Sequence, residues 1–188
     1  MTPFIDIDGH IFQFVCQIEP ERDGNGAILE FMPQERYQNR RSLPMNPYGM
    51  GSFCRYRIPK NRHQEGVYLI TRDGEVVYIG KCIDLTYRHN IGYGQISPKN
   101  CYEGGQPTNC RINAKILKYA KSGHQFGLWF LTTPDSNRIE IELINSCNPA
   151  WNRQHRDIRD IACMEERKND PRRDLESILS ELKNDGRL

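Results

Sequence analysis

EGVYLITRDGEVVYIGK, residues 65–81, is the stretch that decides the fold. It consists of two short segments rich in Val, Ile and Tyr on either side of an Asp-Gly pair, a pattern typical of a β-hairpin. Tyr68 and Tyr78 lie near the two ends of the hairpin, and each has a glycine two residues further out, Gly66 and Gly80. This symmetry raises the question of whether the two phenols act together.

The register of the hairpin decides whether Tyr68 and Tyr78 share a face. A two-residue turn would pair Tyr68 with Ile79 and send the phenols to opposite faces. A three-residue loop over residues 72–74, closed by a left-handed Gly74, pairs Tyr68 with Tyr78 instead. We expect the second register, because it collects the remaining apolar residues on the core face: Val67, Leu69, Val77 and Ile79.

In that register Gly66 lies opposite Gly80, on the face that carries the phenols. A glycine has no Cβ, so a bulky group such as a sugar-phosphate chain can approach its backbone closely. The alternative interpretation is a pair of cross-strand tyrosines that only pack against each other, which is common in sheets.

A helix expected over residues 136–147 carries a carboxylate in an unusual position. At about 100° per residue, Glu140 projects near the middle of an apolar stripe made of Ile139, Leu143, Ile144 and Cys147. A buried carboxylate must be neutralised, ion-paired or metal-bound, because burial of the bare ion is costly. An ion pair with a nearby Lys or Arg and ligation of a hard cation such as Mg²⁺ are the two alternatives.

The chain resembles the GIY-YIG nuclease superfamily. The resemblance consists of five elements in order: GVY (66–68), YIG (78–80), Arg88 ten residues after Tyr78, the helical Glu140, and Asn152 in the ending NPAWN, twelve residues after Glu140. A single triplet is frequent by chance, whereas five elements with these spacings over residues 66–152 are specific.

The resemblance implies an α+β fold with a small three-stranded, mostly antiparallel sheet flanked by helices. The strands would be residues 66–71, 76–80 and 125–132. It also implies an endonuclease that depends on Mg²⁺ or Mn²⁺ and hydrolyses DNA phosphodiester bonds.

The roles of five residues follow from the same resemblance. Tyr68 would be the general base or would relay a proton from the attacking water, and Tyr78 would orient water or phosphate. Arg88 would stabilise the charge of the transition state. Glu140 would bind the metal ion, and Asn152 would hold the local architecture.

Three further residues are expected to support this site. Lys81, directly after YIG, is either a phosphate contact or a solvent-exposed strand end. Many relatives carry His or Tyr four residues after the arginine, where this chain has Gly92. His89 and Tyr93 are the residues that could substitute.

The chemistry is coherent on physical grounds, because phosphodiester cleavage needs an activated water, a cation for the developing charge and a metal ion. A free phenol has a pKa of about 10. For Tyr68 to act as a base near neutrality, Arg88, Lys81 or the metal must lower the pKa of its phenol by ~2–3 pH units. A metal-bound hydroxide is the alternative base.

The chain has 188 residues, a length that suits one domain with extensions. Its net charge is only +2, which excludes a strong overall electrostatic field. We expect an N-terminal β-hairpin and basic loop over residues 1–64, packed on the core. The core would span residues 65–153 and include a long loop at 92–109. A charged helical tail would follow over residues 154–188.

The basic residues are unevenly distributed. Between Arg36 and Arg62 the chain has seven basic residues, no acidic residue and several aromatic residues, a combination that suits phosphate contacts and stacking. A solvated loop is the alternative. The candidates for DNA contact, chosen on charge alone, are Arg40, Arg41, Arg55, Arg57, Lys99 and Arg111.

Seven cysteines without a CxxC pair argue against a disulfide framework and favour a reducing cytoplasm. Cys101, Cys110 and His124 match no standard zinc-ligand spacing, so buried thiols are the preferred interpretation. The sequence contains no signal peptide and no apolar run near the ~18 residues of a membrane span. We therefore expect a cytoplasmic protein without a membrane partner.

The absence of a separate targeting domain favours a restriction-like enzyme that cuts double-stranded DNA at specific sites. Cutting both strands with one metal site each would favour a homodimer. A structure-selective or nicking nuclease of repair or of a mobile element is the first alternative. A catalytically inactive nucleic-acid-binding module is the second.

Overall fold

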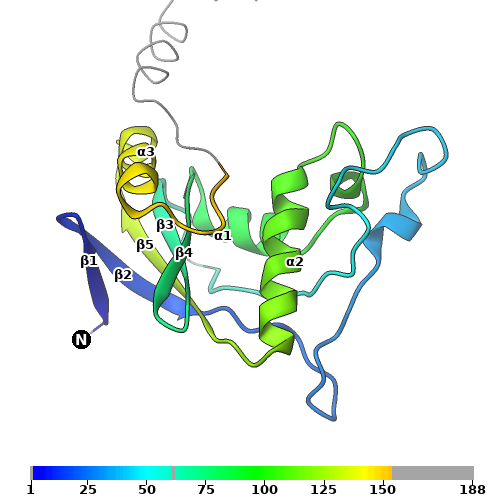
Figure 1. The fold of residues 1–188 in the computed structure, drawn as a ribbon, viewed down its shortest axis with the longest axis horizontal. Helices are drawn as coiled ribbons and strands as arrows, with labels where there is room; N and C mark the ends of the chain where they lie inside the picture. Colours follow the sequence, from blue (N-terminus) through cyan, green and yellow to red (C-terminus); the bar gives the residue numbers. More distant parts are fainter. Residues whose placement is uncertain (1, 61, 154–188) are drawn as a thin grey trace, which may run out of the picture.

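The structure is a computed structural model that describes residues 2–60 and 62–153, and it has an α+β fold (Figure 1). Five antiparallel strands form one sheet: β1 (Phe4–Ile7), β2 (His10–Gln17), β3 (Gly66–Arg72), β4 (Glu75–Cys82) and β5 (Phe126–Thr132). The α-helices are α1 (Leu85–Tyr87), α2 (Pro107–Lys121) and α3 (Ser136–Cys147). A π-helix follows α1 at Arg88–Tyr93, and short 3₁₀ helices lie at Pro33–Arg36 and Pro98–Cys101.

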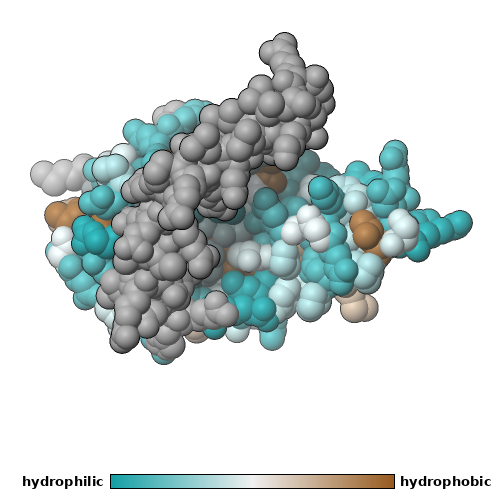
Figure 2. All heavy atoms as spheres, turned by 90° about the horizontal axis from the view of Figure 1, so that it is seen from above, coloured by the Kyte–Doolittle hydropathy of each residue, from teal (hydrophilic) through white to brown (hydrophobic). Residues whose placement is uncertain are grey.

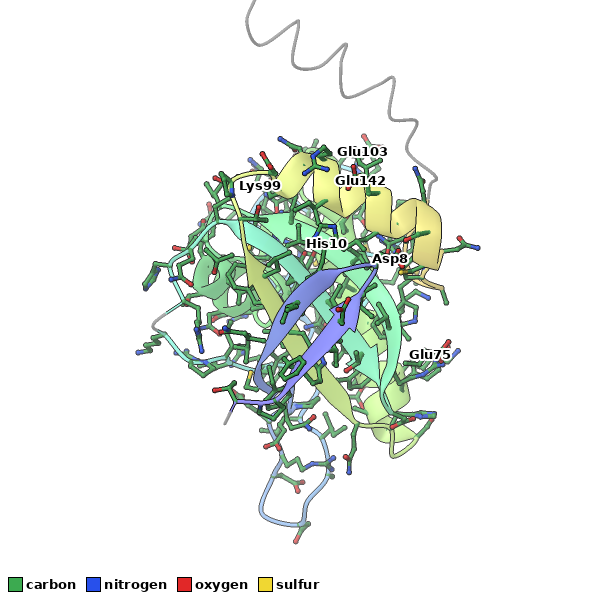
Figure 3. All side chains as sticks on the ribbon, turned by 90° about the vertical axis from the view of Figure 1, so that its left-hand side faces the viewer. Asp8, His10, Glu75, Lys99, Glu103 and Glu142 are labelled. Atoms are coloured by element: carbon green, nitrogen blue, oxygen red, sulfur yellow. The ribbon has the colours of Figure 1, made fainter. Side chains whose placement is uncertain are left out.

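The expected three-stranded sheet is wrong in strand number. The strand order is β1-β2-β5-β3-β4, so the N-terminal hairpin joins the sheet and extends it beyond β5. The physical reason is that β5 would otherwise be an edge with unpaired backbone groups, and β2 satisfies them. Figure 3 looks onto this hairpin, whose tip carries Asp8 and His10 near α3.

The β3–β4 register differs from the expected one. Asp73 (φ 50°) and Gly74 (φ 89°) form a two-residue turn of type I′ that pairs Arg72 with Glu75, so the three-residue loop is wrong. A bulge at Val77 then adds one residue to β4, and Tyr68 pairs with Gly80. The bulge, and not a three-residue loop, is what brings Tyr68 and Tyr78 to the same face of the sheet.

Both tyrosines therefore lie on one face of the sheet, although Tyr78 pairs with Ile70 and not with Tyr68. Val77 also lies on this face, contrary to expectation, because the bulged residue rotates out of the alternation. Helix α2 covers the phenol face, and its apolar contacts there are Ile112, Ile116, Leu117 and Ala120. Helix α3 covers the opposite face with Ile139, Leu143 and Ile144.

The two glycines of the hairpin make room for the protein itself and not for a sugar-phosphate chain. A Cβ at Gly80 would lie 2.6 Å from Cζ of Tyr68. A Cβ at Gly66 would overlap the Leu131 carbonyl of β5. The expectation of bare backbone open to a ligand is therefore wrong at both positions.

The long segments between the strands are ordered by packing. Cys101, Cys110, Phe53, Ile96 and Tyr102 form a small buried cluster under the loop that precedes α2. These two thiols are core residues, and His124 bonds Asp73 elsewhere, so the zinc site is not formed. No helix in the described ranges is long and apolar enough to cross a bilayer. The tail expected over residues 154–188 lies outside the described residues.

Candidate active site

Three tyrosine hydroxyls meet on the α2 face of the sheet. The Tyr93 hydroxyl lies 2.9 Å from the Tyr68 hydroxyl and 3.3 Å from the Tyr78 hydroxyl, so it is hydrogen-bonded to both. The three side chains are buried, and their ring centroids lie 6.2–6.3 Å apart in tilted or edge-to-face contacts. The hairpin and the segment after α1 thus form one hydrogen-bonded unit.

Tyr93 reaches this position because residues 88–93 form a π-helix. In a π-helix the backbone hydrogen bonds join residues that are five positions apart. Tyr93, five residues after Arg88, therefore returns to about the side of the helix that carries Arg88. In an α-helix the residue four positions after Arg88 would do so, and that residue is Gly92. A Cβ at Gly92 would lie within 4 Å of both the Asn109 side chain and Cδ of Arg88, but the glycine has no side chain that could reach the phenols. Of the two residues named as substitutes for a His or Tyr at position 92, Tyr93 and not His89 is therefore the one whose hydroxyl reaches Tyr68 and Tyr78.

The guanidinium of Arg88 stands beside these phenols, with Cζ 5.5 Å from the centre of the Tyr93 ring. Burial opposes the charged form, but the neighbouring Tyr68, Tyr93 and Tyr78 outweigh it and raise the pKa of Arg88. Arg88 is therefore a permanent cation next to the three hydroxyls.

Burial holds Tyr68 and Tyr78 in their protonated form. The pKa of Tyr68 is raised well above 10 by loss of solvent and by the adjacent phenols, although Arg88 acts in the other direction. The pKa of Tyr78 is likewise raised, mainly by burial. In the protein alone neither phenol has the lowered pKa that a base needs near neutrality.

His89 is a buried partner of the cluster. Its Nδ1 lies 3.2 Å from the Tyr56 hydroxyl, and its ring contacts Tyr68 edge-on at a centroid distance of 5.1 Å. Burial and the charge of Arg88 lower the pKa of His89 to about 3, so the ring is neutral at physiological pH. Among the described residues, Nε2 of His89 has no hydrogen-bond partner.

Glu140 lies on α3, which covers the face of the sheet opposite the phenols, and it is next to the edge strand β4. It is 6% exposed, and its Oε2 is 3.7 Å from Nζ of Lys81, which extends from β4. Nζ of Lys81 also donates to Oδ1 of Asn137. The negative charge of Glu140 contributes to the raised pKa of Tyr78, so the carboxylate and this phenol interact across β4. Of the two alternatives for this carboxylate, the ion pair with a lysine is present, at a distance too long for a direct hydrogen bond.

A hard divalent cation at this site would have few side-chain ligands among the described residues. Within residues 2–60 and 62–153, no cluster of three or more His, Cys, Asp or Glu side chains could bind a metal ion alone. Mg²⁺ commonly uses one or two carboxylates and completes its octahedron with water and substrate phosphate oxygens. Glu140 would be that ligand.

Residues 151–152 close the outer edge of β4. Asn152 accepts a hydrogen bond from the Ile79 amide at 2.9 Å and donates to the Ile79 carbonyl at 2.8 Å. The Trp151 amide donates to the Val77 carbonyl at 2.9 Å. These bonds fix the strand that carries Tyr78 and Lys81, which fits the architectural role expected for Asn152.

Arg111 differs from the other candidates for DNA contact. Its side chain is 8% exposed, donates to the Trp151 carbonyl, and its charge acts to lower the pKa of Tyr78. Arg111 is thus a buried neighbour of the site, although charge alone makes it a candidate for DNA contact. No local pattern could indicate its burial, because the carbonyl that it binds is 40 residues away.

The remaining candidates lie at or near the surface. Arg40, Arg41, Arg57 and Lys99 are exposed, and Figure 3 labels Lys99 at the periphery of the molecule. Arg55 is half-buried, with its guanidinium 3.8 Å from the centre of the Phe31 ring. Outside the grey atoms, the face seen in Figure 2 is mainly hydrophilic, with small separate hydrophobic patches.

One further buried polar residue supports the cluster. Nδ2 of Asn113, on α2, donates to the Tyr93 carbonyl at 2.7 Å and to the Cys54 carbonyl at 2.9 Å. Asn113 thereby joins the end of the π-helix to residues 53–56. Sequence reasoning missed it, because an asparagine on an apolar helix face gives no indication of what it will bind.

In comparisons with known proteins, no family model, no curated protein and no solved structure matches the chain significantly.

Proposed function

We propose that the protein is a divalent-metal-dependent endonuclease of the GIY-YIG type that hydrolyses DNA phosphodiester bonds. The observation that carries the proposal is the Tyr93 hydroxyl, which bridges Tyr68 and Tyr78 beside Arg88. A purely structural tyrosine pair would need neither the third phenol nor a partly buried cation. Glu140, which contacts Lys81 of β4 from the other face of the sheet, adds the carboxylate that such chemistry needs.

In this proposal Arg88 and Lys81 bind the phosphate that is cut. A guanidinium matches phosphate geometry and stabilises the charge that develops on its oxygens. The hydroxyls of Tyr68 and Tyr78 orient the attacking water and the phosphate, and Tyr93 holds both hydroxyls in place. Since burial keeps Tyr68 protonated, its role is to orient and relay, not to serve as a standing phenolate.

Glu140 would hold the metal ion, with Lys81 as a neighbour that also meets the phosphate. When bound, such an ion polarises a phosphate oxygen and lowers the pKa of water at the site.

A restriction-like enzyme that cuts double-stranded DNA at specific sites is the form that we favour. The exposed arginines between residues 36 and 62 supply a surface for the backbone of a duplex, which carries most of the affinity of DNA-binding proteins. A homodimer would provide one site for each strand.

Cleavage of DNA in the presence and absence of Mg²⁺ tests the proposal. Plasmid and genomic DNA are incubated with the protein plus Mg²⁺, Mn²⁺ or a chelator. Discrete fragments support site-specific cleavage. Nicked circles, or cleavage confined to branched DNA, support a repair or mobile-element enzyme instead.

Two substitutions in one helix provide the matched control. Glu140→Gln removes the metal ligand without a change of shape, and we expect it to abolish cleavage. Glu142→Gln, on the outer side of α3 where Arg138 pairs with it, should retain activity (Figure 3). DNA binding without metal-dependent cleavage by the unmodified protein would identify an inactive binding module and refute the proposal.

A further inference from the structure

A hollow of about 460 Å³ adjoins the site on the far side of Arg88. Its lining is mainly apolar and comes from the end of β4, α1, the π-helix and the start of α2: Cys82, Ile83, Asp84, Tyr87, Arg88, Gly92 and Gln106. Sites for small molecules commonly enclose roughly 300–1,000 Å³. The hollow therefore has room for a nucleobase and its sugar.

Two large apolar side chains on its wall are unusually exposed. Ile83 is 83% exposed and Tyr87 is 65% exposed. The Asp84 carboxylate accepts a hydrogen bond from the Tyr87 amide at 2.7 Å, so the backbone that presents the Tyr87 ring is fixed. Exposed aromatic rings next to a phosphate-binding cation are the usual platform for a base.

Polar groups of suitable type complete the wall. Gln106 accepts a hydrogen bond from Asn109 at 2.8 Å through Oε1, so its amide NH₂ remains as a donor. Asp84 contributes a carboxylate that also contacts His63 at 2.8 Å. A donor and an acceptor beside an aromatic ring are what the polar edge of a base requires.

We propose that this hollow binds the base of a nucleotide next to the phosphate that is cut, with the base stacked on Tyr87 and its phosphate on Arg88. The inference rests on the proposed function, because it takes Arg88 as a phosphate ligand. The occupant is argued from Arg88, because this residue lines the hollow while its guanidinium lies over the Tyr93 ring of the site.

Binding of single nucleotides, measured by saturation-transfer NMR, tests the proposal without any cleavage reaction. The probes are dAMP, dGMP, dCMP and TMP, with 2-deoxyribose 5-phosphate as the probe that lacks a base. We expect saturation of the base protons and weaker binding of the sugar phosphate. Tyr87→Ala should weaken nucleotide binding about fivefold or more, as expected for loss of one stacking contact.

Three variants control for unrelated effects. Tyr87→Phe keeps the ring and should bind like the unmodified protein. Ile83→Ala should weaken binding, whereas Ile11→Ala, an exposed isoleucine on β2 at 56%, should not. Circular dichroism confirms that each variant is folded.

Equal affinity for nucleotides and 2-deoxyribose 5-phosphate, or an unchanged affinity in Tyr87→Ala, would overturn the proposal. So would light scattering that shows a dimer in the unmodified protein and a monomer in Tyr87→Ala, because a second copy would then cover the patch. Nucleotide binding by a protein that cuts no DNA would refute the nuclease but not the pocket. DNA cleavage together with unchanged nucleotide binding in Tyr87→Ala would refute the nucleotide pocket but not the nuclease.

Discussion

Loss of the Tyr93 hydroxyl should weaken both activity and stability. Tyr93→Phe removes the hydrogen bonds that it makes with Tyr68 and Tyr78, which are both buried. Removal of one buried partner costs about 1–3 kcal/mol, so the free energy of unfolding should fall by that amount in urea titrations. Cleavage of plasmid DNA should fall by at least about tenfold, because the two remaining hydroxyls lose their orientation.

Tyr102→Phe is the matched control for this change. The Tyr102 hydroxyl donates to the Gln34 carbonyl at 3.0 Å in a separate buried cluster. Its removal should lower the free energy of unfolding to a similar degree and leave cleavage by the folded protein unchanged. Equal losses of cleavage in the two variants would mean that Tyr93 acts only through stability.

His89 should make the protein sensitive to acid. Its pKa is about 3 in the folded protein, compared with 6.5 when exposed, so the unfolded chain binds a proton that the folded protein rejects. The stabilisation is complete above pH 6.5 and is lost as the pH falls towards 3. Between these limits the loss approaches about 1.4 kcal/mol per pH unit.

Urea unfolding of the unmodified protein and of His89→Gln, between pH 4 and 8, measures this effect. The variant lacks the titrating ring, so its stability should fall less steeply below pH 6. Parallel curves for the two proteins would contradict the assignment of a neutral, buried His89.

At the residue scale, the sequence indicated some of the neighbours and missed others. Tyr68 and Tyr78 share a face as expected, and Arg88 lies beside Tyr93, whereas Glu140 lies on α3, which covers the opposite face of the sheet. The sequence could not predict the protonated state of the phenols, because burial depends on α2 and on residues 53–58, which are remote in sequence. For the same reason the contacts of Arg111 and Asn113 were missed.

At the level of elements, Gly80 in β4 should tolerate no side chain. Its missing Cβ makes room for the Tyr68 ring, so Gly80→Ala must displace that ring or the strand. Overpacking of this kind costs about 1–3 kcal/mol, and cleavage should be lost with the position of the phenol. Thermal unfolding and the cleavage assay measure the two effects.

Gly24 is the matched control, because a Cβ there would meet nothing within 4 Å and its backbone is not left-handed. Gly24→Ala should therefore leave the melting temperature and cleavage unchanged. If Gly80→Ala also left both unchanged, the close fit between Gly80 and Tyr68 would contribute neither to stability nor to cleavage.

The β3–β4 hairpin shows where local patterns reach their limit. The Asp-Gly pair correctly indicated a turn, and at the N-terminal hairpin the same pair (Asp8, φ 51°; Gly9, φ 80°) forms the expected connection. The bulge at Val77 could not be predicted, because the Val77 carbonyl is bound by the Trp151 amide. The π-helix is similar, since it depends on where Tyr93 and Asn113 find their partners.

At the level of the whole molecule, the α+β class that the GIY-YIG resemblance implies is correct, but the size of the sheet is not. Whether an N-terminal hairpin packs on a sheet or joins it depends on which edge remains open. That edge belongs to β5, which is more than 100 residues further along the chain. Sequence periodicity has no information on such pairings.

The basic segment should control the salt dependence of DNA binding. Each phosphate contact contributes a slope of about 0.9 in a plot of log K against log salt concentration. The double variant Arg40→Ala/Arg41→Ala should therefore reduce the slope by about 2 in fluorescence anisotropy with a labelled duplex. Arg22→Ala, at an exposed turn where Arg22 binds the Gly26 carbonyl, should not change it. An unchanged slope in the double variant would mean that Arg40 and Arg41 do not contact the DNA.

The bonds from Trp151 and Asn152 to β4 also determine how far the chain can be shortened. A fragment that ends with α3 at Cys147 would keep every residue proposed to touch the phosphate or the metal ion. It would nevertheless expose the outer edge of β4, which would then be open to pairing with other chains. A shortened version of this protein must therefore run at least through Asn152.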